Sequence, residues 1–197
     1  MPAFDPTEIV SGPLYLYLGK SALEATPDVL PADATLFGAA WGGTWRNLGW
    51  STPDGFTAAG LSQEKSPVNT AQQRPAVTFL AGNAAETVGF TLIQATLQNI
   101  KDMAGRGQLT TVAAGAGTYG HTDLKFSDSA VAYVALGIEA FGLNGRPRRM
   151  IYPIGMMSVT GDLSQTFTQE MRIPAQFMRA GGPTGDPVWR DILLPTS

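Results

Sequence analysis

The chain has 197 residues, enough for one domain with a substantial core. Only 15% of the residues are charged, the formal net charge is −3, and there is no cysteine and one histidine. These counts exclude disulfides, thiolate metal sites and histidine clusters for zinc or iron. Charged residues are depleted from interface cores, so the composition favours self-assembly over the alternative, a small Gly- and Thr-rich β protein with an uncharged polar surface.

The apolar runs are short and interrupted by Gly or Pro, so we expect no transmembrane helix and no membrane partner. The first residues lack a basic region followed by an apolar one, so we expect no secretory signal and assembly in the host cytoplasm. The mildly acidic balance and the lack of a basic stripe argue against tight nucleic-acid binding.

Residues 1–12 are predicted to form an N-terminal arm, and 14–18 (LYLYL) a buried strand. Residues 20–44, rich in Ala, Pro, Asp and Gly, predict a long loop, which inside a compact domain is usually either functional or disordered. Three tryptophans follow within ten residues, and packing in a core or an interface is favoured over binding of a sugar or a base: Trp41, Trp45 and Trp50.

Residues 51–55 (STPDG) predict a turn, and 55–61 a strand. The stretch 61–72 is predicted as a long exposed loop whose charged tip is 62–66; 67–72 and 76–81 are extended, with Pro75 at a bulge or an edge.

Residues 86–93 alternate between apolar and polar types, which predicts a half-buried strand. A helix is predicted over 94–104, with Gly105 as its C-cap. Its apolar stripe is expected to comprise Ile93, Leu97, Ile100 and Ala104.

A Gly-, Thr- and Ala-rich excursion over 107–128 is predicted as a third long loop. Residues 131–141 predict a strand that is apolar on both faces apart from Glu139, as expected between two layers. An Asn-Gly turn predicts a hairpin to a partner strand over 149–157, which contains Pro153.

Residues 163–173 alternate over eleven positions and are predicted as one strand, and 188–192 as the last strand. The whole chain, 1–197, is predicted to be a single mainly β domain: a β-sandwich or partly closed barrel with one flanking helix.

No group of residues predicts catalysis, a cofactor or a metal. His121 is interpreted as an exposed loop residue, and the Gly115, Gly117 and Gly120 spacing lacks the strand, helix and acid of a dinucleotide site. Two carboxylate pairs, Asp54 with Glu64 and Asp123 with Asp128, are interpreted as solvated turns rather than calcium ligands. The arginines Arg146, Arg148 and Arg149 favour a hairpin shoulder or a salt bridge over a phosphate site.

Several motifs occur in a specific order: WRNLGWSTPDGFT over 45–57, QQRP over 72–75, ETVGFTLI over 86–93, ATLQNI over 95–100, the strand 149–157 with its YP, and RIPAQF over 172–177. In that order they resemble the major tail tube proteins of long-tailed, non-contractile phages, especially those infecting actinobacteria. Residues 20–44 and 107–128 match nothing in that pattern.

The resemblance implies a β-sandwich with a flanking helix that closes into a hexameric ring around a lumen, with loops reaching into the neighbouring ring, and no enzymatic activity. The implied partners are further copies of the chain and the tape measure, tail terminator and baseplate or tip proteins of the virion, while double-stranded DNA passes through without specific binding. The alternatives are a tail terminator, a head decoration protein, or a tube subunit of a contractile injection or secretion system.

Two sets of site residues follow as hypotheses. The wall of a channel for DNA should be polar and neutral to acidic, so strand faces of Ser and Thr are expected to line it. These lumen-facing residues are Thr87, Thr91, Ser164, Thr166, Thr168, Glu170 and Arg172. The contact between stacked rings is expected at the polar tip Leu61, Ser62, Gln63, Glu64, Lys65, Ser66, Pro67, Val68 and Asn69, together with the 107–128 excursion.

Overall fold

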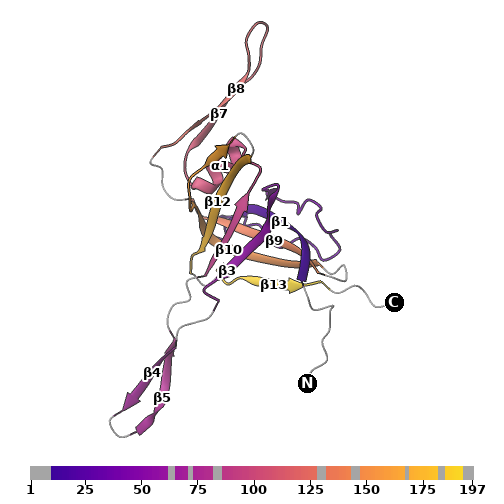
Figure 1. The fold of residues 1–197 in the computed structure, drawn as a ribbon. Coiled ribbons are helices and arrows are strands. Elements are labelled where there is room, and N and C mark those ends of the chain that lie inside the picture. Colours follow the sequence, from indigo (N-terminus) through magenta and orange to yellow (C-terminus); the bar gives the residue numbers. More distant parts are fainter. Residues whose placement is uncertain are drawn as a thin grey trace.

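The computed structural model describes residues 10–61, 65–70, 73–81, 86–127, 132–142, 147–166, 169–181 and 185–192 (Figure 1). This part of the chain is mainly β with one helix, which confirms the predicted fold class. The large sheet comprises nine strands. They are β1 (Val10–Lys20), β2 (Arg46–Asn47), β3 (Ser51–Ala59), β6 (Thr87–Leu92), β9 (Val134–Gly142), β10 (Pro147–Val159), β11 (Ser164–Thr166), β12 (Gln169–Arg179) and β13 (Val188–Asp191).

The sheet follows the order β2-β1-β9-β10-β12-β6-β3, with β13 added to the first half of β10 and β11 added to β12. It curls so that β1 and β3, its two long end strands, approach each other. In the described part of the chain β1 and β3 do not pair with each other. The segment just before β3 bonds to β1 instead, through the short β2 and through the Leu48 amide, which donates to the Leu16 carbonyl (2.8 Å). The barrel is therefore only partly closed.

Strand β10 connects the two layers of the sandwich. Its first half pairs with β9 and β13, and its second half pairs with β12. The register shifts between Tyr152 and Gly155, around the Pro153 that cannot donate to the ladder. A Cβ at Gly155 would lie 2.1 Å from the Phe177 ring, so the crossing requires glycine. The bulge redirects the strand from one layer to the other.

Both layers contribute to one core. Leu136, Ile138 and Tyr152 come from the first layer, and Leu92, Ile173 and Phe177 from the second; all are fully or nearly fully buried. Helix α1 (Leu97–Ala104) packs at one end of this core.

The helix begins at Leu97 rather than 94, because Thr96 caps it by accepting a bond from the Asn99 amide at 3.1 Å. Gly105 ends it in the left-handed conformation (φ 64°), as predicted. The predicted apolar stripe was only partly right: Ile100 packs against the core, but Leu97 is 40% exposed, and the buried helix positions are Asn99 and Met103. Asn99 is buried because its amide donates to the carbonyls of Leu48 and Gln94, both at 2.8 Å, which a search for apolar periodicity does not detect.

Two further expectations were wrong. Residues 51–55 lie in β3, where the register shifts between Ser51 and Phe56 and Gly55 has φ 72°, so these turn-forming residues make a bulge instead. The eleven-residue strand 163–173 is a hairpin, because β11 and β12 pair antiparallel with Ser164 opposite Arg172. In addition, β1 begins at Val10, within the predicted arm; residues 1–9 lie outside the described part.

Two hairpins extend from the sandwich. One lies where extended segments were predicted over 67–72 and 76–81, and the other lies where the 107–128 loop was predicted. One consists of β4 (Lys65–Thr70) and β5 (Gln73–Ala81), and the other of β7 (Gln108–Val112) and β8 (His121–Lys125). Figure 1 shows them projecting from opposite ends of the body, with β7–β8 beside α1.

Candidate assembly surfaces

One broad face of the sandwich is polar and carries little charge. Strands β10, β12, β6 and β3 align Ser158, Gln176, Gly89 and Thr57 in one row across the sheet. The next row consists of Met156, Met178, Thr87 and Ala59. The alternate residues of these strands, such as Val88 and Phe177, point into the core. These outer residues are half-buried or exposed, and we call this surface the polar face.

The polar face is slightly hollowed, with a groove of about 290 Å³ lined mainly by uncharged groups, including Thr57, Thr91 and Gln176 of β3, β6 and β12 and Thr160 just after β10. Asp54 is the charged residue in this lining. Farther along β12, Arg172 pairs with Glu170 at 2.9 Å. A backbone hydrogen bond and the Arg172 guanidinium lower the pKa of Glu170, so this ion pair is charged but balanced at neutral pH.

The structure places four of the predicted lumen-facing residues on the same face of the sheet, spread along it: Thr87 and Thr91 on β6, and Glu170 and Arg172 on the outward face of β12. Ser164 and Thr166 lie in β11, next to them, but their side chains are outside the described ones, and Thr168 is outside the described residues. The sequence reasoning missed Thr57, Ser158 and Gln176. Following the alternation in β12 past Ile173 would have found Gln176. That this face lines a lumen remains a prediction.

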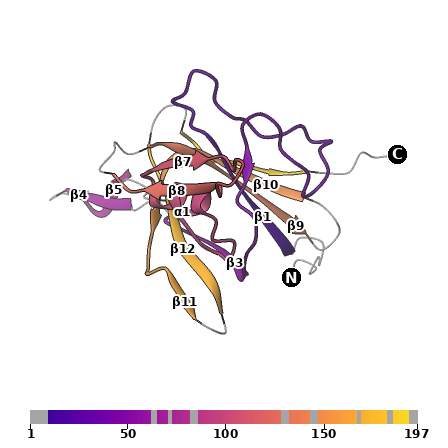
Figure 2. The same cartoon turned by 90° about the horizontal axis from the view of Figure 1, so that it is seen from above.

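The opposite side of the body is covered by the 21–45 segment, as Figure 2 shows from above, with the β11–β12 hairpin projecting on the other side. This segment contains no helix or strand and packs through aromatic rings. Trp41 stacks on Tyr17 (4.4 Å between centroids) and meets Trp45 edge to face (5.2 Å). A Cβ at Gly137 would lie 2.4 Å from the Trp41 ring, so glycine in β9 makes room for it.

A buried ion pair holds this covering segment on the sheet. The Arg149 side chain donates to Glu139 (2.7 Å) and to the carbonyls of Ala32 and Thr35, while Glu139 accepts from the Gly38 amide (2.8 Å). Both charged side chains are fully buried. Burial, followed by the nearby Glu139 charge, raises the pKa of Tyr17 to about 12, so its hydroxyl stays protonated and donates to the Ala39 carbonyl. The predicted 20–44 loop therefore covers a second, smaller core.

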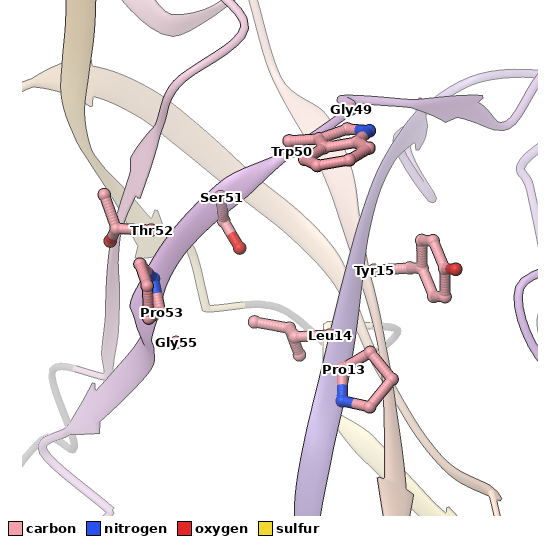
Figure 3. Close-up of a pocket in the computed structure, with 9 residues that line it drawn as sticks. All are labelled: Pro13, Leu14, Tyr15, Gly49, Trp50, Ser51, Thr52, Pro53 and Gly55. Atoms are coloured by element: carbon pink, nitrogen blue, oxygen red, sulfur yellow. The ribbon is translucent and has the colours of Figure 1, made fainter. Parts of the chain in front are cut away.

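A third surface is the seam between β1 and β3. Figure 3 shows Leu14 and Ser51 pointing toward one another across the gap, with Trp50 at one end of it. The cleft measures about 350 Å³ and has no charged residue in its lining, which also includes Pro13 and Pro53. Trp41 and Trp45 pack against other rings within the subunit, whereas Trp50 is 76% exposed, so its predicted packing in an interface remains a prediction. We call this cavity the seam cleft.

The predicted stacking residues are only partly described. Leu61 is 53% exposed at the base of the β4–β5 hairpin. Lys65, Ser66, Pro67, Val68 and Asn69 lie in β4, whose side chains are not described, and Ser62, Gln63 and Glu64 lie outside the described residues.

The residues tested for chemistry do not converge. His121 is exposed on β8, 3.7 Å from Asp123, and the three spaced glycines are at or beside the tip of the β7–β8 hairpin. Arg148 pairs with Asp191. In the described part of the chain, no group of three or more His, Cys, Asp or Glu is placed to hold a metal ion. No described helix is long and apolar enough to cross a membrane.

Residues 7–190 match the family described as phage tail tube protein, which includes both segments that carried no recognisable motif. The chain belongs to this family. Tail tube proteins are structural components of the virion tail that assemble with further copies of themselves into a tube. Among curated proteins, none is similar enough in sequence to count as a relative.

Proposed function

We propose that this tail tube protein forms rings of six copies in a long non-contractile tail, and that stacked rings enclose a channel through which double-stranded DNA is ejected. We further propose that its role is purely structural, without enzymatic activity. The polar face supports this proposal most directly, because a broad strand surface with few charges is suited to line a channel for DNA.

The physical requirement on such a channel is that DNA must slide without being retained. Each basic side chain that contacts a phosphate releases counterions and strengthens binding, especially at low salt. Most described side chains of the polar face are uncharged; Asp54 is acidic, and Arg172 is paired with a carboxylate. A wall of this composition offers DNA few contacts that would have to be broken during ejection.

The two sides of the body support one orientation of the subunit. The polar face and the β11–β12 hairpin lie away from the 21–45 segment, so a ring with the polar face inward places that segment outside (Figure 2). The hairpins that project from opposite ends are then directed along the tube axis, toward the rings above and below (Figure 1). The tape measure, terminator and tip proteins would contact this tube inside it and at its two ends.

Charge placed on the polar face tests the proposal. The variant Thr57→Lys/Thr91→Lys adds two cations to that face, and Ala25→Lys/Thr26→Lys adds two to the exposed covering segment as a matched control. We expect both variants to assemble into tubes in electron microscopy. In virions complemented with each variant, ejection should be slower for the first and unchanged for the control, with a difference that grows as salt is lowered.

Three outcomes would contradict the proposal. A tube reconstruction with Thr57 and Thr91 on the outer surface refutes the lumen assignment. Closed single rings without tubes at high protein concentration favour a terminator-like protein, and a contractile sheath around the tube in virions excludes the non-contractile tail.

The β4–β5 hairpin is proposed as one stacking contact. Deletion of 62–66 should leave a folded subunit that no longer forms tubes, because β4, in which Lys65 and Ser66 lie, pairs with β5 and is not part of the large sheet. Circular dichroism checks the fold and electron microscopy the tubes; tubes of normal length would refute this contact.

A further inference from the structure

The β7–β8 hairpin contributes almost nothing to its own subunit. Five residue pairs join its strands, and nearly every residue from 110 to 127 is exposed. Only its base touches α1, where Leu109 and Leu124 face each other across the two strands. An isolated two-stranded hairpin is marginally stable in water, so this arm gains most by packing against another molecule.

The tip of this hairpin has a defined shape and carries a single large side chain. Gly115 and Thr118 exchange backbone hydrogen bonds (3.0 and 3.1 Å), and a Cβ at Gly120 would lie 2.6 Å from the Ala114 nitrogen. The segment 113–118 (AAGAGT) consists of small, uncharged residues, followed by Tyr119, which is 94% exposed. A narrow, pre-shaped tip with one exposed aromatic ring is suited to insertion into a cleft, because little conformational entropy remains to be lost.

The seam cleft has the complementary properties. It is bordered by main-chain edges of β1 and β3 that pair with no other described strand: β1 pairs with β2 only at Tyr17 and Leu18, and β3 pairs with β6 alone. Its lining is uncharged, it contains the Ser51 hydroxyl, and the exposed Trp50 ring borders it. A volume of about 350 Å³ is at the lower end for a ligand pocket, which is appropriate for one aromatic side chain.

We propose that Tyr119 of one copy inserts into the seam cleft of a second copy in the neighbouring ring. This inference rests on the proposed stacking of rings. The hairpin points away from its own body, so the occupant of the cleft comes from another molecule (Figure 1). Assembly of the family into a tube makes a second copy the partner that is always present.

Charge distinguishes this cleft from another groove of similar size. A groove of about 370 Å³ between the covering segment and β13 includes Asp28, Asp186 and Arg190 in its lining. An uncharged tip that enters it would desolvate these groups without pairing them, which is unfavourable. The uncharged seam cleft carries no such cost.

The absence of cysteine from the chain permits a direct test. Tyr119→Cys and Ser51→Cys subunits are mixed, assembled and treated with a short bismaleimide. We expect a crosslinked dimer containing one of each variant, at least about tenfold more abundant in tubes than in unassembled subunits. The matched control replaces Ser51→Cys by Val188→Cys, which lies in the charged groove and is 44% exposed.

A second measurement uses side-chain variants that leave the fold intact, because Tyr119 is almost fully exposed. Tyr119→Ala should raise the critical concentration for tube assembly about tenfold, as loss of an interface hot spot does. Tyr119→Phe should restore most of the assembly, since the ring provides most of the contact area.

The outcomes separate the two proposals. If the unmodified protein forms no tubes, the proposed function fails. If it forms tubes but Tyr119→Cys crosslinks better to Val188→Cys than to Ser51→Cys, or if Tyr119→Ala assembles normally, the insertion into the seam cleft is refuted while the tube remains.

Discussion

Substitution of Arg149 should release the covering segment from the sheet. In the variant Arg149→Met, Glu139 remains as a buried carboxylate without its guanidinium, and the Ala32 and Thr35 carbonyls lose their donor. Removal of one partner from a buried ion pair costs about 3–5 kcal/mol. For a chain of this length, each kcal/mol lowers the melting temperature by about 2–4 °C, so the expected decrease is roughly 6–20 °C.

The neighbouring arginine provides a matched control. Arg148 pairs with Asp191 at the surface, where both side chains are substantially exposed, so Arg148→Met should cost no more than about 1 kcal/mol. A second control removes both buried charges. Glu139→Leu/Arg149→Met leaves no unpaired charge and should be more stable than Arg149→Met alone, although the loop groups still lose their partners.

The measurements are urea unfolding of the unassembled subunit and limited proteolysis. Arg149→Met should unfold at a lower urea concentration and be cleaved within 21–45 before the sandwich is digested, because the ion pair joins this segment to β9 and β10. Equal destabilisation by Arg148→Met and Arg149→Met would refute the reasoning. So would a double variant less stable than Arg149→Met.

Three further predictions concern packing and pH. Gly137→Ala should lower the free energy of unfolding by about 1–3 kcal/mol, because its Cβ would overlap the Trp41 ring. The control is Gly181→Ala, whose Cβ would have nothing within 4 Å. In the same urea titration it should leave the free energy of unfolding unchanged. Asn99→Ala should lower the free energy of unfolding by about 2–3 kcal/mol, because the Leu48 and Gln94 carbonyls lose their donor. Gln98→Ala, on the helix surface, should lower it by less than about 1 kcal/mol. Similar losses in the two variants would contradict the role of Asn99. The raised pKa of Tyr17 means that the folded state holds this proton more tightly than the unfolded chain, whose tyrosines titrate near 10. The free energy of unfolding should therefore fall as the pH rises from about 10 to about 12. Tyr17→Phe should reduce that fall. An identical pH dependence in the variant would contradict the assignment of this effect to Tyr17.

The sequence predicted best those elements whose side chains alternate between core and surface. In 87–92 each apolar residue is buried and each intervening residue half-exposed, so the pattern defined both the strand and its faces. The two-sided burial of β9 was also evident, because Ala135, Ile138 and Glu139 are all buried, on alternate faces. The helix end was predicted by Gly105, whose left-handed conformation is a local property.

The remaining features depend on tertiary contacts. The hairpin between β11 and β12 turns between Thr166 and Gln169, where no Gly, Pro or Asn marks a turn. The polar row across four strands arises from registers between distant segments, such as Thr57 opposite Gly89, which spacing along the chain does not contain. The burial of Glu139 depends on Arg149 and on the 21–45 segment, and the seam cleft depends on how far the sheet curls.

The positions of the few charged residues show how most arginines are paired within the subunit. Six arginines form ion pairs with carboxylates: Arg46, Arg148, Arg149, Arg172, Arg179 and Arg190. A guanidinium already paired has less to gain from a phosphate, because it would have to exchange one anion for another. Trp41 and Trp45 belong to the covering segment, Trp41 stacks on Tyr17, and Figure 2 shows this segment on the side of the body away from the β11–β12 hairpin. If the polar face lines the channel, Arg172 on that face is already paired with Glu170, and these aromatic rings are kept away from DNA. Among the described residues, Trp50 and Tyr119 are the most exposed large aromatic side chains. We therefore expect aromatic rings to form contacts between copies and to be absent from the wall of the channel.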